Sequence, residues 1–176
     1  MDHMEIIDNF LQQDEFDKLE RIVMGNRFPW YHSESIVSKG EVINDNSFYS
    51  VHMLYDNDRP TNDTSMEIMK PILMRLKEEQ AEDRFAGTLI RVKINSYPNQ
   101  NKFIEHKMHQ DFPPNKIPYM ACLFSLNTCD GYTKFEDGTK VESVKNRALI
   151  FNPTLNHCST NTTDQKRRVN INFNYI

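Results

Sequence analysis

Two stretches in the first half of the chain carry apolar residues at the spacing of an amphipathic helix. Between Ile6 and Val23 apolar positions recur three or four residues apart, with Asp and Glu between them. This pattern predicts a short strand or turn that leads into a helix. A second stripe, rich in Met, Ile and Leu, runs from about Ser65 to Glu79. We interpret its methionines as core residues, and we expect Pro71 to kink or delay this helix.

From Gly87 onward the pattern changes to short alternating or β-branched runs separated by Asn, Pro and Gly. The predicted strands are Thr88–Tyr97, Phe103–His109, Ile117–Leu126, Tyr132–Glu136, Arg147–Asn152 and Arg168–Tyr175. Phe48–Leu54 is also compatible with a strand, and the polar segment Asn57–Asp63 after it is predicted to be a loop. Short strands after early helices predict a mainly β fold with flanking helices, an antiparallel barrel or jelly roll.

Length and composition place the chain among small globular proteins. At 176 residues and 20.8 kDa, one domain is expected. We expect residues 1–86 to supply helices and supporting strands, and residues 87–176 to supply the core of the β structure. The net charge of -4 and the pI near 5.9 argue against nucleic acid as a partner, because nucleic-acid-binding proteins usually present a basic stripe.

Cysteine usage and the N-terminal pattern bear on location. Cys122, Cys129 and Cys158 are odd in number and form no close metal-binding pair, which favours a reducing, cytoplasmic location. No basic region followed by an apolar stretch begins the chain, and no run of about 18 apolar residues occurs in it. We therefore expect no membrane partner.

A metal site is suggested by His109-Gln110-Asp111, because on a strand this spacing points both ligand-type side chains to the same side. The pattern is weak alone, since His3-Met4-Glu5 and His32-Ser33-Glu34 also place an acid two residues after a histidine. His109 differs because His157 follows after several predicted strands, which allows opposite strands of a barrel to meet. A loop histidine without a ligand role is the ordinary alternative for His157, and His106 is assigned no role.

Two imidazoles and one carboxylate form a facial triad that suits iron(II), because half of the coordination sphere stays open for substrates and dioxygen. A structural zinc site would instead be closed by four protein ligands. His109, Asp111 and His157 are therefore the predicted catalytic metal ligands.

The final predicted strand alternates strictly between polar and apolar residues. Its polar face consists of Arg168, Asn170, Asn172 and Asn174. A polar face in water is the common explanation for such a strand, but Asn is depleted in strands, which favours amides with a hydrogen-bonding role in a polar cavity. Arg168 would then point inward, where its guanidinium can grip a carboxylate with two parallel hydrogen bonds. By parity, Arg167 points the other way.

Asn95 and Tyr97 share one face of an earlier predicted strand and could contact the same ligand, although core or surface packing is an equal alternative. Downstream, the sequence from Tyr132 to Gly138 predicts a hairpin. We assign this hairpin no chemistry.

Taken together, His109, Asp111, His157 and Arg168 match the order of motifs in the iron(II)- and 2-oxoglutarate-dependent dioxygenases, and the C-terminal half of the chain resembles that superfamily. The interval from His157 to Arg168, 168 minus 157 or 11 residues, fits two neighbouring strands and a turn. The resemblance implies a double-stranded β-helix. It also implies bound Fe(II), 2-oxoglutarate as co-substrate and O2, with ascorbate as a further candidate cofactor.

The resemblance also implies contacts to the co-substrate. Arg168 would bind its far carboxylate with help from Tyr97, and the Asn95 and Asn170 positions are similar to co-substrate contacts of AlkB-like nucleic-acid demethylases. Those demethylases carry a second arginine on the last strand, where this chain has Asn174. Together with the acidic charge, this departure favours the small prolyl-hydroxylase-like and phage-type oxygenases.

The predicted function is hydroxylation of an unidentified protein or small-molecule substrate, with release of succinate and CO2. Two alternatives stay open. One is an AlkB-like demethylase, and the other is a non-catalytic β-barrel protein that binds a carboxylate ligand without redox chemistry.

Overall fold

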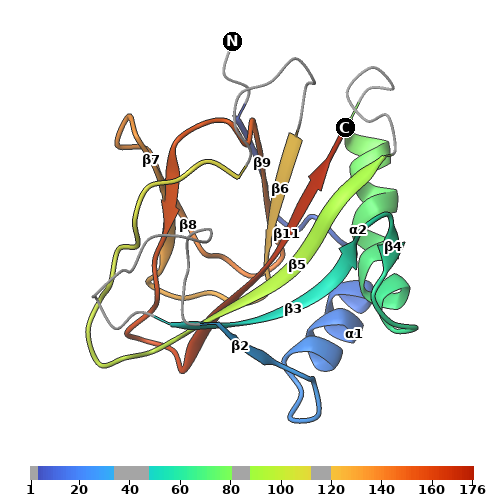
Figure 1. Ribbon diagram of the computed structural model, residues 1–176, viewed down its shortest axis with the longest axis horizontal. Helices are drawn as coiled ribbons and strands as arrows, with labels where there is room; N and C mark the ends of the chain where they lie inside the picture. Colours follow the sequence, from blue (N-terminus) through green and yellow to red (C-terminus); the bar gives the residue numbers. More distant parts are fainter. Residues whose placement is uncertain (1–3, 34–47, 81–87, 112–119) are drawn as a thin grey trace.

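The computed structural model describes residues 4–33, 48–80, 88–111 and 120–176, and the structural statements below refer to these ranges. Two packed β-sheets and two helices make up the described chain (Figure 1). The helices are α1 (Gln13–Val23) and α2 (Ser65–Glu79). The strands of the large sheet, in spatial order, are β1 (Met4–Ile7), β9 (Arg147–Phe151), β6 (Met120–Ser125), β11 (Arg167–Tyr175), β5 (Leu89–Pro98), β3 (Tyr49–Asp56) and β2 (Tyr31–Ser33), and β4 (Arg59–Pro60) pairs with β3.

The small sheet contains β10 (His157–Ser159), β7 (Tyr132–Phe135) and β8 (Lys140–Glu142), in that spatial order. Two isolated bridges, Glu105 with Thr160 and His109 with His157, extend it along β10. All of the strand pairs are antiparallel. The predicted strand Phe103–His109 is wrong as a continuous strand, because between these residues the structure has only the two bridges.

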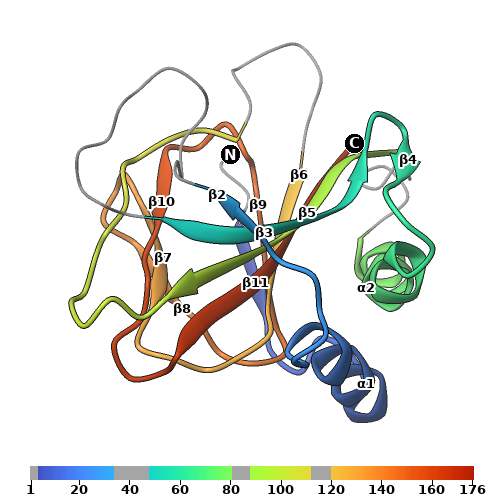
Figure 2. The ribbon, with the colours of Figure 1, turned by 60° about the horizontal axis from the view of Figure 1, so that its bottom comes forward.

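The helices lie on one side of the large sheet, and the small sheet lies on the other side (Figures 1 and 2). Alternation along the strands produces this arrangement, since successive side chains point to opposite faces. On β11, Ile171 and Phe173 belong to the apolar core that the helices cover. That core also includes Phe16 of α1 and Ile72 of α2. The two apolar stripes predicted in the first half of the chain thus form helices, and these helices cover the apolar face of the large sheet.

The α2 prediction is confirmed at both ends, and Pro71 lies inside the helix. Among its methionines, Met69 is fully buried, whereas Met66 is 45% exposed and does not belong to the core. Neither helix in the described ranges is long and apolar enough to cross a bilayer.

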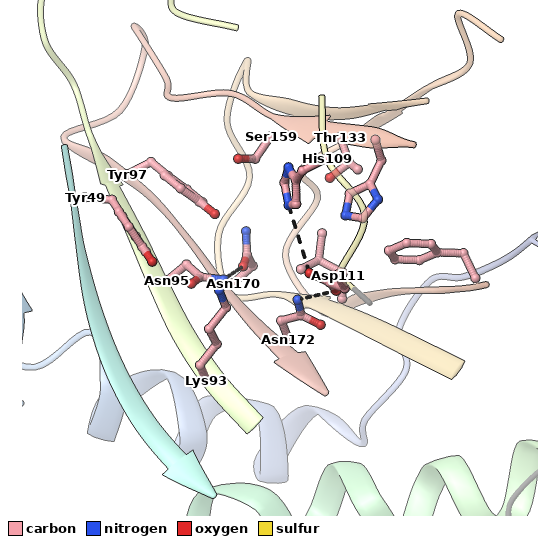
Figure 3. A pocket seen from close by; sticks show the side chains of 13 residues that line it. Tyr49, Lys93, Asn95, Tyr97, His109, Asp111, Thr133, Ser159, Asn170 and Asn172 are labelled. Atoms are coloured by element: carbon pink, nitrogen blue, oxygen red, sulfur yellow. Dashed lines mark hydrogen bonds and ion pairs between the residues drawn. The ribbon is translucent and has the colours of Figure 1, made fainter. Parts of the chain in front are cut away.

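The polar face of β11 is not in water. Arg168, Asn170 and Asn174 are at most 1% exposed, and Asn170 and Asn172 line the cavity (Figure 3). The interpretation of this face as the wall of a polar cavity is thus confirmed, and the water-facing alternative is wrong.

Candidate active site

Three ligand-type side chains from distant parts of the chain converge between the sheets. One ligand atom of each of His109, Asp111 and His157 lies within 4.8 Å of those of the other two. The two histidines are directly paired, since the backbone N–H of each donates to the carbonyl of the other at 2.9 Å. The loop alternative for His157 is therefore wrong, because β10 holds this residue beside His109. The other two His-x-acid motifs take no part, since His32 is exposed on β2, and His3 and Glu34 lie outside the described residues.

Each histidine ring is held through its Nδ1. His157 Nδ1 lies 2.8 Å from the carbonyl oxygen of Leu155, and His109 Nδ1 lies 3.3 Å from that of Lys107. A neutral imidazole that donates from Nδ1 keeps its lone pair on Nε2, which is the arrangement of metal-ligating histidines. Burial and the neighbouring His157 lower the pKa of His109, which favours this neutral form.

The carboxylate of Asp111 is the best-supported group in the site. Asn172 and Asn174 donate to its Oδ2 at 3.0 and 3.1 Å, and Arg91 Nη2 lies 3.6 Å from its Oδ1. Burial alone raises the pKa of Asp111, but the charges of His157, Lys93 and Arg91 and the Asn172 hydrogen bond outweigh it, so the pKa falls to about 2. Asp111 is thus ionised and oriented to ligate a cation.

A cavity adjoins the three ligands. Its lining is mostly polar and includes all three ligands together with Asn95, Tyr97 and Asn170 (Figure 3). The lining also includes Asn172 of the predicted polar face, and four residues that the sequence analysis left without a role: Tyr49, Lys93, Thr133 and Ser159. Lys93 lies two residues before Asn95 on the same strand, so the alternation that placed Asn95 and Tyr97 on one face also places Lys93 there. The hairpin assigned no chemistry supplies Thr133, so that expectation is corrected.

Arg168 lies behind this cavity lining rather than in it. Its Nη1 donates to the carbonyls of Tyr132 and Thr160, at 2.8 and 3.2 Å, and its Nη2 donates to Thr133 Oγ1 at 3.0 Å. Its Nε is buried without a partner, and no carboxylate pairs with its guanidinium in the ranges that the structure describes. Thr133 both lines the cavity and contacts the guanidinium, so the positive charge borders the cavity.

Gly131 makes room for this arginine. A Cβ atom at position 131 would lie 2.7 Å from Arg168 Cδ and 2.5 Å from the carbonyl oxygen of Asn161. Any other residue would displace the Arg168 side chain or the backbone, and no short motif in the sequence signals this requirement.

Arg167 lies on the opposite face of β11, as parity predicts. Its Nη2 donates to the carbonyl of Met24 at 3.1 Å, and its guanidinium lies 5.3 Å from the centre of the Trp30 ring. Arg168 is therefore the arginine that faces the site.

Tyr97 lies between Arg168 and the cavity. Its ring stacks on Tyr49 with centroids 5.6 Å apart and lies 6.0 Å from the guanidinium carbon of Arg168. Burial raises the pKa of Tyr97 to about 12, so its phenol remains a hydrogen-bond donor. His106 is buried at the back of this group, where its Nδ1 lies 2.8 Å from Ser159 Oγ and its ring contacts Tyr97. Its role is packing beside the site.

The donor set fits iron(II). Two imidazole nitrogens and one carboxylate within ligand reach of each other, beside an open cavity, match the facial donor set of non-haem iron oxygenases. A closed zinc site would need a fourth protein ligand, and no further His, Cys, Asp or Glu joins the group among the described residues.

No family model matches the sequence, and no curated protein matches it. Solved structures do match over nearly the whole chain. A prolyl hydroxylase from Trichoplax adhaerens, in complex with a peptide fragment of hypoxia inducible factor, is similar with a TM-score of 0.69 and 15% identity, over 98% of this chain and 83% of that one. A prolyl-4-hydroxylase from Pseudomonas putida is similar with a TM-score of 0.63 and 15% identity, over 99% and 93%.

The third similar structure is the epimerase SnoN in complex with Fe3+, alpha ketoglutarate and nogalamycin RO. Its TM-score is 0.69 at 11% identity, and the match covers 99% of this chain and 79% of that one. The chain thus has the double-stranded β-helix fold of the iron(II)- and 2-oxoglutarate-dependent oxygenases.

Proposed function

We propose that residues 1–176 form one catalytic domain that acts as an Fe(II)- and 2-oxoglutarate-dependent oxygenase. The observation that carries this proposal is the convergence of His109, Asp111 and His157 within 4.8 Å at a polar cavity. These three residues would hold the iron and leave its other positions to ligands. When bound, Fe(II), 2-oxoglutarate and O2 supply the oxidation, with succinate and CO2 as by-products, and ascorbate is a candidate accessory reductant.

Arg168 would bind the far carboxylate of 2-oxoglutarate. A fully buried guanidinium without a carboxylate partner is costly, and an anionic ligand relieves that cost. Tyr97 would donate its phenol to the same carboxylate, and Thr133 already orients Nη2 toward the cavity. Asn95 and Asn170 hydrogen-bond to each other at 3.0 Å and would contact the middle of the co-substrate.

The substrate is a protein segment or a small molecule that is hydroxylated next to the metal. Among the similar structures, the T. adhaerens enzyme binds a peptide fragment and SnoN binds nogalamycin RO, so the fold serves both classes. Nucleic acid is disfavoured by the net charge of -4 and by Asn174, whose amide supports Asp111. We also propose a reducing, cytoplasmic location, because all three cysteines are buried and free.

The first test is anaerobic titration of the metal-free protein with Fe(II) and 2-oxoglutarate. An oxygenase site forms a weak visible charge-transfer band that requires both components, and adding O2 releases succinate. Asp111→Ala should lose the band and the succinate, whereas the exposed Asp63→Ala should keep both. Undiminished succinate release by Asp111→Ala would refute the proposal. Tight zinc retention without the band would favour the non-catalytic carboxylate-binding alternative.

A second test compares the neighbouring arginines. Arg168→Lys should raise the Kd of 2-oxoglutarate by about ten- to a hundredfold, because the planar two-bond contact is lost while the positive charge remains. Arg167→Lys is the matched control, since that side chain contacts Trp30 on the other face, and its Kd should stay unchanged. Equal effects of the two substitutions would contradict the assignment of Arg168 as the anchor.

A further inference from the structure

A partly buried lysine faces the proposed metal ligands and has no assigned partner. Lys93 on β5 lines the same cavity as His109, Asp111 and His157 (Figure 3). Its ammonium has no hydrogen bond or ion pair with any residue in the described ranges. An ammonium group that lines a recessed cavity and has no hydrogen-bond acceptor there is a candidate for binding a ligand.

The position of Lys93 on the wall separates it from the proposed co-substrate anchor. Tyr97 pairs with Arg168 across β5 and β11, and Lys93 pairs with Asn172 two steps further along. Four residues of strand separate Lys93 from Tyr97, which corresponds to roughly 13 Å along β5. Across the two strands Lys93 therefore pairs with the residue that supports Asp111, whereas Arg168 pairs with Tyr97.

Asp111 cannot serve as the partner of Lys93 in the working site. Its Oδ2 already accepts hydrogen bonds from Asn172 and Asn174, and its Oδ1 lies nearest to Arg91 and His109. As a metal ligand, the same carboxylate would share its charge with the cation. The Lys93 ammonium is thus left for a group that enters the cavity.

The charge balance points to an anion. Lys93 and Arg168 place two positive charges in or against the cavity, and Asp111 is the one carboxylate among its described lining residues. If the proposed function is correct, a bound divalent metal adds two positive charges, and the two carboxylates of 2-oxoglutarate offset them. The site therefore keeps a positive excess that favours a negatively charged substrate.

We infer that the substrate is a small molecule with a carboxylate, which binds to the Lys93 ammonium and presents a neighbouring C–H to the metal. This inference rests on the proposed function and names its substrate class. A small molecule fits better than an acidic side chain of a protein, because Lys93 is recessed beside the proposed metal ligands rather than on an open surface. The unpaired amide oxygen of Asn172 borders the same space and would accept a hydrogen bond from the remainder of the substrate.

The test uses the anaerobic protein loaded with Fe(II) and 2-oxoglutarate. The probes are the proteinogenic amino acids and short mono- and dicarboxylic acids, each compared with its primary amide. At least one acid should perturb the charge-transfer band saturably and accelerate succinate release, and its amide should not. Lys93→Met should raise the Kd of that acid by about ten- to a hundredfold, the loss expected for one charge-assisted hydrogen bond.

Matched variants make the result specific. Lys93→Arg keeps the charge and should retain more of the binding than Lys93→Met, and Lys93→Gln covers the case in which the methionine variant does not fold. The exposed Lys145→Met is the control and should bind the acid normally.

Each outcome decides one way. If the loaded protein responds to no acid, or responds equally to acid and amide, the inference is overturned while the oxygenase proposal stands. A weakened 2-oxoglutarate band in Lys93→Met without any probe would overturn it as well, because Lys93 would then serve the co-substrate. Absence of the band in the wild-type protein would instead overturn the proposed function.

Discussion

Polar residues face each other in pairs across β5 and β11 and build one wall of the site. The pairs are Tyr97 with Arg168, Asn95 with Asn170, Lys93 with Asn172, and Arg91 with Asn174. Several of their atoms are buried without a partner, including Asn170 Nδ2 and Asn172 Oδ1. Each such atom costs about 1–3 kcal/mol, so a wall of this kind is expected where a polar ligand supplies the missing bonds.

The amides that hold Asp111 should tune its metal affinity. Asn174→Ala removes one of two hydrogen bonds to Oδ2 and frees the carboxylate to rotate. We expect the Kd for Mn(II), measured calorimetrically, to rise about tenfold or more, as for other supporting partners of metal ligands. The exposed Asn26→Ala should leave it unchanged. Unaltered Mn(II) affinity in both Asn172→Ala and Asn174→Ala would contradict this role.

At the scale of elements, aromatic contacts fix α1 against the back of the large sheet. The ring of Phe124 on β6 lies 6.0 Å from that of Phe10 and 6.1 Å from that of Phe16. All three are at most 1% exposed. Because β6 pairs with β11, this packing also supports the strand whose other face carries the polar wall.

Removing this contact should destabilise the whole fold. Phe124→Ala leaves a cavity between α1 and the sheet, and we expect the free energy of unfolding to fall by about 3–5 kcal/mol. Phe103, which is 41% exposed, offers the control, and Phe103→Ala should cost about 1 kcal/mol or less. Urea unfolding of both variants measures the difference, and similar losses would show that the interface is not tightly packed.

The elements differ in how well the sequence alone predicted them. The bounds of α2 were predicted at both ends, because its apolar stripe persists over several turns. The strand β10 was missed, since three residues are too short to carry a period, and it brings His157 beside His109. The segment from Phe103 to His109 has a strand-like composition but pairs only at two isolated bridges. The pairing of this segment depends on the segment of the same chain that lies beside it rather than on its own residues.

At the scale of the whole molecule, the charged groups of the site lower the free energy of unfolding. Burial, followed by the charge of Arg91, lowers the pKa of Lys93 from 10.5 to about 8, so its protonated form is disfavoured by folding. That penalty is fully present below about pH 8. It fades as the pH rises toward the ordinary lysine value, because the unfolded chain then holds more protons than the folded one.

Lys93→Met should therefore stabilise the metal-free protein. At pH 7 the gain should be at most about 3 kcal/mol, the free energy that corresponds to the depressed pKa of Lys93. The advantage over the wild-type protein should shrink between about pH 8 and pH 10 as the wild-type lysine loses its proton. Denaturant unfolding across this range measures it, with Lys145→Met as the control. A variant less stable than the wild-type protein at pH 7 would refute the expectation.

Periodicity and parity, which are local properties of the chain, determined the two helices, most of the strands and the faces on which Asn95, Tyr97, Arg168 and Asn170 lie. The order of His109, Asp111, His157 and Arg168 also selected, among six histidines, the two that the structure brings together with Asp111. Tertiary structure alone decided which groups meet: the pairing of His109 with His157, the support of Asp111 by Asn172 and Asn174, and the space that Gly131 leaves for Arg168. These arrangements depend on contacts between residues far apart in the chain, so the spacing of neighbouring residues cannot predict them.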